Sequence, residues 1–405
     1  MSRGPVAQAW SPQARGDLDA LRGLAALMVG IFHSLMWLRI AGDERILMLS
    51  SGEATTFQGA VVRSLLAVFN GATAVDLFFV LSGFALAVAW PDGRLCVRTV
   101  LAFYVRRTLR LWPAYAASLL LVALYLEAVR GDFHDWPQAA SWMSQFYRLG
   151  ASEVDWPANL ALLSVALNPV AWSLRVEVLM SACLPGLLLL ARHLGGVVAL
   201  AQIGIAFVVA LFCRYDVVGH FLYIFLLGVY GGVFRCALTD AVQRVGIPWR
   251  VLRCLCIAAL GLPGFVTLEH HPLADLSIGL GSLGLILCIS QRPPDHWSAW
   301  ACALRAVLVC YGAMSYSFYL CHFVVLYAVA WALLTLVPQA FLAAWPLPVM
   351  LGSLVVSLLL STLLAQAMHR GVERPAMRLG AWLTIRIGRD VRSQTASPAR
   401  RVVRR

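Results

Sequence analysis

The sequence predicts an all-α polytopic membrane protein, and three observations support this fold class. The 405-residue chain is 60% hydrophobic and only 13% charged, with a mean hydropathy of +0.77, whereas soluble domains are about one quarter charged. Apolar stretches recur along nearly the whole chain. The Arg residues gather in alternate loops between these stretches, as expected when membrane topology follows the positive-inside rule. A multi-pass helical bundle is therefore favoured over a soluble domain.

A helix needs about 20 mostly apolar residues to cross a bilayer. About ten segments meet this requirement: 18–40, 72–90, 109–129, 171–191, 196–213, 217–235, 251–268, 274–290, 314–336 and 346–368. The stretch 157–170 is shorter and contains two prolines, so we expect an interfacial or re-entrant segment there.

The charged loops predict that both termini are cytoplasmic, because this orientation places most Arg inside and most acidic residues outside. We expect a short cytoplasmic segment over 1–17, a transmembrane domain over 18–375, and a basic cytoplasmic tail over 376–405. The tail is predicted to begin as an interfacial helix and to be disordered from Ser393.

The longest predicted outer loop, 130–159, is too short to fold alone. It is expected to lie on the membrane, with Trp136, Trp142 and Trp156 at the interface.

Composition excludes several kinds of chemistry. The net charge is +12 and every basic residue is Arg, so no lysine can act as a nucleophile. Positive charge beside a membrane favours topology and lipid contact over nucleic-acid binding. The ten Cys show no framework spacing and are predicted to be small buried hydrophobes. The His residues are dispersed, apart from the adjacent His270 and His271, so the sequence predicts no metal site.

Arg22 and His33 lie eleven residues apart in the first apolar segment. This spacing places both side chains on one helix face, about 16 Å apart along the axis. Asp19 precedes Arg22 by three residues and can pair with it. A structural role and a catalytic role are both open for His33 on spacing alone. In the catalytic interpretation it is a general base or an acyl-relay residue.

Arg106, Arg107 and Arg110 open the third segment, and both Arg106 and Arg107 share a face with Arg110. An anchor at the membrane surface is one interpretation. The alternative is a bidentate clamp for phosphates on a cytosolic donor such as coenzyme A.

Two carboxylates lie inside apolar segments. Asp76 follows GATAV, and a lone acid there needs a partner. Glu177 lies below the predicted interface, four residues after Ser173 and five after Trp172. We expect both acids to act at the site, while an outer-edge Glu in water remains the simpler alternative for Glu177.

A polar stripe runs along the ninth segment, where Ser315, Tyr319 and His322 share one face. This stripe indicates either a lined cavity or a histidine satisfied by a neighbouring helix. After the tenth segment, Glu373 and Arg374 are predicted to form a cytoplasmic ion pair, and Pro375 is predicted to end the helix.

Six blocks, in order, resemble the acyltransferase-three family of bacterial integral-membrane acyltransferases. They are LDALRGLAALMVGIFH, AVDLFFVLSGF, YVRRTLRLWPAY, WSLRVE, SYSFYLCH and VERP, and they extend from Leu18 to Pro375. The family's basic-x10-His motif maps onto Arg22 and His33, and its Arg-x-x-Arg motif maps onto Arg107 and Arg110. Arg175 departs from the pattern, because a small or apolar residue is more usual there.

The resemblance implies ten spans in a bacterial cytoplasmic membrane and transfer of an acyl group, often acetyl, from cytoplasmic acyl-CoA to a carbohydrate. Some relatives carry a fused extracytoplasmic hydrolase-like domain. Here we expect any later transfer step to use a separate protein or the acceptor itself. The competing class is an exporter or flippase of a glycan or lipid-linked precursor, which usually has repeated halves and broken helices; the sequence shows neither.

The sequence therefore predicts an O-acyltransferase with His33 as its catalytic centre, and Glu177 and Asp76 orienting or charge-balancing it from the outer side. Coenzyme A phosphates are expected on Arg107 and Arg110, with Arg22 and Arg106 nearby.

Overall fold

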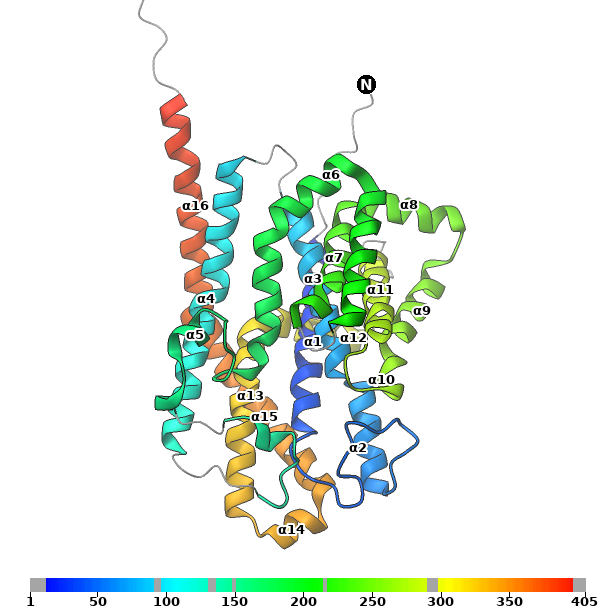
Figure 1. Ribbon diagram of the computed structural model, residues 1–405, viewed down its shortest axis with the longest axis vertical. Coiled ribbons are helices and arrows are strands. Elements are labelled where there is room, and N and C mark those ends of the chain that lie inside the picture. Colours follow the sequence, from blue (N-terminus) through cyan, green and yellow to red (C-terminus); the bar gives the residue numbers. More distant parts are fainter. Residues whose placement is uncertain are drawn as a thin grey trace, which may run out of the picture.

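The computed structural model describes residues 12–90, 96–129, 136–147, 151–213, 217–289 and 298–395. The helices are α1 (Pro12–Ser34), α2 (Phe57–Val68), α3 (Gly71–Ala89), α4 (Val97–Ala128), α5 (Trp156–Leu160), α6 (Trp172–Phe212), α7 (Val217–Val233), α8 (Arg235–Val245), α9 (Trp249–Gly261), α10 (Pro263–Val266), α11 (Pro272–Ile289), α12 (Ala299–Ala313), α13 (Ser315–Leu336), α14 (Gln339–Ala344), α15 (Pro346–Met368) and α16 (Arg374–Thr395). Within these ranges no strand forms beyond one isolated β-bridge, and the all-α prediction is confirmed. Helices α2 and α14 lie at one end of the bundle, and α8 and the far end of α16 lie at the other (Figure 1).

Seven helical segments are long and apolar enough to cross a membrane, or eight if the bent pair α7–α8 counts as one span. The chain is thus a multi-pass membrane protein. Helix α1 is not among the seven, because Asp17, Asp19 and Arg22 occupy its first half. The expected total of ten and the cytoplasmic placement of both termini stay predictions.

Two expected spans, 171–191 and 196–213, are the two halves of α6. Gly195 separates them, with φ of 77° and ψ of −173°, a conformation that essentially only glycine adopts. The helix bends there at the top of the molecule (Figure 1). The predicted boundary between the two spans therefore has a local cause in the backbone.

Glycines let the central helices approach closely. On α3 and α7, a Cβ at Gly83 would meet the backbone at Phe225, and a Cβ at Gly228 would overlap the carbonyl of Val80. Both helices are almost wholly buried around this crossing. Gly83 and Gly228 therefore allow the close packing of α3 against α7.

The C-terminal region corrects one prediction. Pro375 does not end a helix; it lies at the second position of α16, within a continuous helical path. A five-residue π-helix, His369–Glu373, joins α15 to α16. The segment Pro346–Ile385 is consequently a single apolar unit of 40 residues. Residues 393–395, expected to be disordered, are helical, and 396–405 lie outside the described residues.

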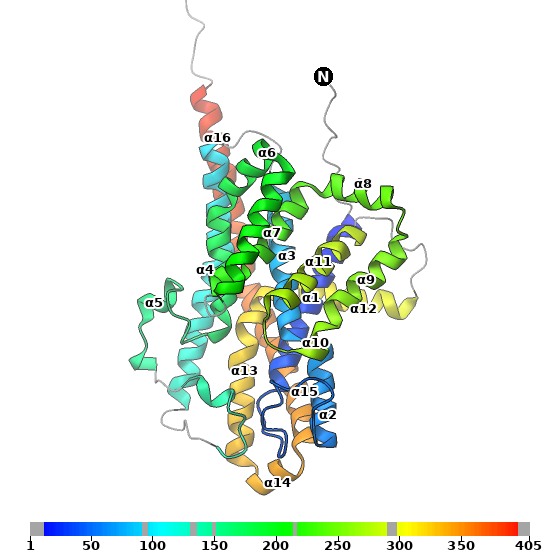
Figure 2. The same cartoon turned by 45° about the vertical axis from the view of Figure 1, so that its right-hand side comes forward.

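The region expected to lie on the membrane between α4 and α6 is irregular. It contains α5 and three short 3₁₀ turns, Met143–Gln145, Ala151–Glu153 and Pro169–Ala171. Its residues 130–135 and 148–150 lie outside the described part of the chain. Figure 2 shows this region against one flank of the bundle beside α4.

Candidate active site

A cavity of about 340 Å³ lies between α1, α3, α4, α6 and α13. Its charged lining consists of Arg22, Arg107, Arg110 and Glu177. Hydroxyl groups line it too, from Ser82, Ser173, Ser315, Tyr316 and Tyr319. The fold therefore gathers residues from five of the motifs that the sequence analysis singled out. We call this space the arginine cavity.

Arg107 and Glu177 form an ion pair in the wall of the arginine cavity. Arg107 also donates from Nε to Ser181 Oγ at 2.9 Å, and Ser82 donates to Glu177 Oε1 at 2.6 Å. Each charge thus has several partners, which offsets the cost of removing it from water. The structure corrects the prediction for Glu177: this carboxylate balances Arg107 and makes no described contact with His33.

Arg22 and Arg110 border both the arginine cavity and a neighbouring cavity of about 670 Å³. Arg22 lies 3.2 Å from Asp19, so the predicted pairing is confirmed. Among the ion pairs of the described residues, none involves Arg110. Arg110 is therefore better placed than Arg107 to receive an anion, and Arg22, whose partner Asp19 is 42% exposed, lies beside it on the same two cavities.

Three further cationic residues were not among the predicted site residues. Arg370, Arg374 and Arg378 of the π-helix and α16 line the same 670 Å³ cavity as Arg22 and Arg110. Their four-residue spacing was visible in the sequence, and it predicts one shared helix face. The expected end of the helix at Pro375 concealed it. Glu373 also differs from prediction, because it bonds Ser317 at 2.6 Å and His369 at 2.9 Å instead of Arg374.

Arg106 is exposed and lines a third cavity, of about 360 Å³, together with Arg107 and Arg110. Arg110 thus borders all three cavities. This position at their junction distinguishes it from its two neighbours in the motif.

His33 forms a hydrogen-bonded pair with His322. His33 Nδ1 lies 2.9 Å from His322 Nε2, and the rings are stacked within 3° of parallel. His322 Nδ1 lies 2.7 Å from the carbonyl of Tyr319, which can only accept a hydrogen bond. His322 Nδ1 therefore carries a proton, and in the neutral pair His322 Nε2 accepts from His33 Nδ1. This leaves the Nε2 of His33 unprotonated.

Trp142 also stacks with His33, with ring centroids 5.5 Å apart and planes 19° apart. Phe323 meets His33 edge-on at 5.4 Å. Trp142, which is predicted at the membrane interface, thus comes from the irregular segment to contact the imidazole of His33; its depth in the membrane stays a prediction. Loop residues give no helical periodicity from which this contact could be predicted.

Tyr319 connects the histidine pair with the arginine cavity. Its hydroxyl lies 2.8 Å from Ser173 Oγ and 2.8 Å from the carbonyl of Val170, while its own carbonyl holds His322. His33 is not part of the cavity lining. The predicted stripe of Ser315, Tyr319 and His322 thus runs from the cavity to the imidazoles. Tyr319 stands between the two.

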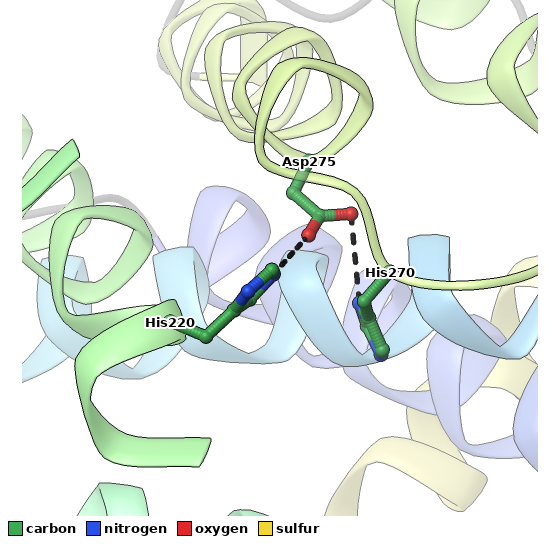
Figure 3. Close-up of side chains that lie close together, drawn as sticks. All are labelled: His220, His270 and Asp275. Atoms are coloured by element: carbon green, nitrogen blue, oxygen red, sulfur yellow. Dashed lines mark hydrogen bonds and ion pairs between the residues drawn. The ribbon is translucent and has the colours of Figure 1, made fainter. Parts of the chain in front are cut away.

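Asp76 does not reach His33. It lies on α3 beside the carboxyl group of Asp275 of α11, and Asp275 is itself close to His220 and His270 (Figure 3). The structure thus separates the predicted group of His33, Glu177 and Asp76 into three places. Trp172 packs edge-on against His270 with ring centroids 5.9 Å apart.

Arg175, the departure from the expected motif, has a local role. It donates to the carbonyl oxygens of Leu162 at 2.7 Å and Leu163 at 3.0 Å. Leu162 has a positive φ of 59°, which is strained for a leucine. Arg175 thus fixes the turn that follows α5.

Comparison with protein families gives one match. A family described as an acyltransferase domain matches residues 15–366, which is most of the chain. No curated protein and no solved structure matches this sequence.

Proposed function

Because the chain belongs to this acyltransferase family, we propose that it is an integral-membrane O-acyltransferase of the bacterial cytoplasmic membrane. It takes an acyl group, most readily acetyl, from cytoplasmic acyl-CoA and delivers it to a hydroxyl of a carbohydrate at or beyond the membrane. The observation that carries the proposal is the His33–His322 pair beside the arginine cavity. It supplies a positioned base close to a cationic pocket.

The donor's phosphates bind Arg22 and Arg110, with Arg370, Arg374 and Arg378 extending the positive surface. Guanidinium groups suit this task because they bind phosphate oxygens in bidentate fashion. Arg107 shapes the wall through its pair with Glu177. The apolar part of the arginine cavity, from Val75, Phe78 and Phe79, accepts the extended arm that carries the thioester.

His33 has two chemically balanced routes. As a general base, its Nε2 takes the proton of the acceptor hydroxyl, whose oxygen attacks the thioester carbonyl and displaces coenzyme A thiolate. As a nucleophile, Nε2 attacks the carbonyl itself, and the hydroxyl then takes the acyl group from the imidazole. In both routes His322 fixes the tautomer, and the thiolate finally receives a proton. Because Tyr319 separates His33 from the cavity, its side chain must move for the thioester to arrive.

The test is acyl transfer by purified protein, measured as acetyl-CoA-dependent labelling of the native surface glycan fraction. His33→Ala should lower the rate by about 10²–10⁴-fold, the usual contribution of a general base. The matched control is His193→Ala, because His193 is exposed on α6. Full activity of His33→Ala would overturn the mechanism.

Two variants of His322 separate positioning from packing. His322→Gln keeps an acceptor for the Nδ1–H of His33, whereas His322→Ala removes it. We expect His322→Gln to retain more transfer activity than His322→Ala, with both variants folded. Equal loss in both would count against the tautomer argument. Continued acylation with failure of glycan export in His33→Ala would instead favour the exporter.

A further inference from the structure

A compact group of histidine and aspartate side chains lies away from the arginine cavity. His220 comes from the first turn of α7, Asp275 from the first turn of α11, and His270 from the loop that precedes α11. His220 Nε2 lies 2.7 Å from Asp275 Oδ2, and His270 Nδ1 lies 3.5 Å from Asp275 Oδ1 (Figure 3). One potential ligand atom of each residue lies within 4.8 Å of the others. We call these three residues the histidine–aspartate cluster.

Burying these polar and charged side chains costs free energy unless a further partner satisfies them. Asp275 and His220 are 1% and 3% exposed, and Asp76 beside them is fully buried. The oxygens of Asp76 have no donor except the neighbouring Asp275 carboxyl, which can bond them only by sharing a proton, and His220 Nδ1 has no partner. His270 Nδ1 and Asp275 Oδ1 have only each other, at the long distance of 3.5 Å. These are five of the fourteen such buried atoms among the described residues. Buried polar atoms are normally satisfied, so their concentration here indicates an unfilled site.

We propose that the histidine–aspartate cluster binds one divalent transition-metal ion, with Asp76 as a fourth ligand or a charge-balancing neighbour. Two imidazoles and a carboxylate are ligands that suit Zn²⁺ and related ions. Two carboxylates and one divalent cation also leave no net charge, which removes the cost of placing Asp76 and Asp275 together in a buried site.

The spacing fits the coordination geometry of such an ion. Ligands at about 2.1 Å from a tetrahedral Zn²⁺ lie about 3.4 Å from one another. The 3.5 Å separation of His270 and Asp275 already matches this value. His220 must exchange its 2.7 Å hydrogen bond to Asp275 for a metal bond, which requires an opening of under about 1 Å.

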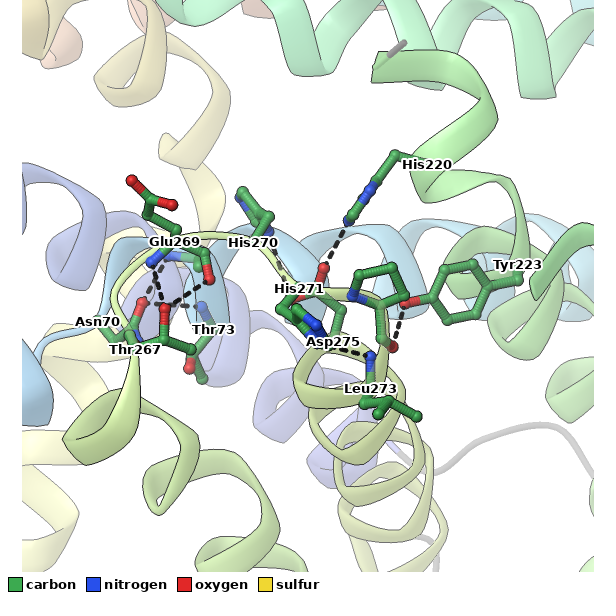
Figure 4. Close-up of polar contacts among 12 residues, drawn as sticks. Asn70, Thr73, His220, Tyr223, Thr267, Glu269, His270, His271, Leu273 and Asp275 are labelled. Carbon is green, nitrogen blue, oxygen red and sulfur yellow. Dashed lines mark hydrogen bonds and ion pairs between the residues drawn. The ribbon is translucent and has the colours of Figure 1, made fainter. Parts of the chain in front are cut away.

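The surrounding loop holds His270 in place and leaves a route to the site. Thr267 Oγ1 accepts from the amide of Glu269 at 3.1 Å, and Asn70 donates to the carbonyl of Thr267 at 3.4 Å (Figure 4). The side chain of His270 is 26% exposed, so an ion can enter beside it. His271 turns away from the cluster, since its Nδ1 accepts from the amide of Leu273.

The test is the metal content of the full-length protein, purified in detergent with an affinity tag that contains no histidine. After incubation with Zn²⁺ and removal of unbound ion, we expect about one Zn²⁺ per chain by mass spectrometry. His270→Ala and Asp275→Asn should weaken Zn²⁺ binding by at least the roughly 10–100-fold that loss of even an outer-shell group costs. His271→Ala should bind as the unaltered protein does.

Thermal melting guards against misfolded variants. Zn²⁺ should raise the Tm of the unaltered protein and of His271→Ala, and should not raise that of His270→Ala, whose altered residue lies in a loop. Equal Zn²⁺ binding by His270→Ala and His271→Ala would overturn the proposal. So would a protein that binds no Zn²⁺, Mn²⁺, Co²⁺ or Fe²⁺, because Asp76 and Asp275 would then share a proton instead.

Discussion

The arginine cavity and the histidine–aspartate cluster hold charge in opposite ways. Around the arginine cavity and its 670 Å³ neighbour, six Arg face three acidic residues, and much of the lining is partly exposed. In the cluster and the adjoining Asp76, two buried carboxylates lie near two histidines and lack enough donors. An excess of accessible positive charge suits a large soluble anion that binds and leaves. Buried, under-satisfied ligands suit a small cation that stays.

The largest expected effect concerns the Arg107–Glu177 pair. Glu177→Gln leaves the charge of Arg107, whose side chain is only 11% exposed, without its counter-charge. We expect a loss of about 3 kcal/mol in the free energy of unfolding, measured by denaturant titration in detergent. Asp19→Asn, which breaks the more exposed pair with Arg22, should cost about 1 kcal/mol or less. Similar losses for both variants would show that Glu177 is not a buried counter-ion.

The next prediction separates donor binding from metal binding. Arg110→Ala should weaken acetyl-CoA binding by about 10–100-fold, because a hydrogen bond to a charged group contributes roughly 1.5–3 kcal/mol. Zn²⁺ content should stay unchanged. Arg244→Ala, on exposed α8, is the control and should bind acetyl-CoA normally. Titration calorimetry measures the acetyl-CoA affinity of both variants. An unaltered affinity in Arg110→Ala would remove this residue from the donor site.

The third prediction tests the packing that brings Asp76 and His220 together. At Gly228 on α7, an added methyl group would overlap the backbone of α3. Gly228→Ala should therefore destabilise the protein by about 1–3 kcal/mol and lower Zn²⁺ binding. Gly186 has no atom within 4 Å of its Cβ position, so Gly186→Ala should be neutral or stabilising by up to about 1 kcal/mol. A fall in Tm for Gly186→Ala equal to that for Gly228→Ala would contradict the packing argument.

The smallest expected effect concerns Asp43, a carboxylate outside both regions whose oxygens are all bonded. Its side chain accepts hydrogen bonds from the amides and hydroxyls of Thr55 and Thr56. Burial acts to raise the pKa of Asp43, but these donors outweigh it and hold the pKa below its ordinary value of 3.8. Its stabilising contribution is therefore complete above that value and is lost as the pH falls through the lower, folded-state pKa.

Asp43→Asn should destabilise by about 1 kcal/mol at neutral pH, a typical net contribution of a hydrogen bond. The difference from the unaltered protein should shrink as the pH falls below about 4, the ordinary pKa of an aspartate, and through the lower pKa of folded Asp43. Denaturant titrations at pH 3 and pH 7 measure this. A difference in the free energy of unfolding that is larger at pH 3 than at pH 7 would contradict the prediction.

Much of the fold was predictable because a bilayer requires long apolar segments. The predicted segments 217–235, 274–290 and 314–336 agree with α7, α11 and α13 within two residues at each end. The exceptions have local causes. Helix α4 begins twelve residues before the expected 109, because Arg98, Arg106 and Arg107 interrupt the apolar pattern of its first turns. The helical path continues through Pro375, which predicted an end, directly after the π-helix His369–Glu373.

The sequence by itself determined the membrane class, the family and the helix faces of Arg22, Arg110, Ser173, Tyr319 and His322, because apolar length and helical spacing are local properties of the chain. Tertiary structure alone decided which charges meet. It joined His33 to His322 across 289 positions, paired Glu177 with Arg107, and carried Asp76 to Asp275, His220 and His270. These contacts depend on which helices pack together, through close approaches such as that at Gly228. No periodicity within one segment specifies its neighbour.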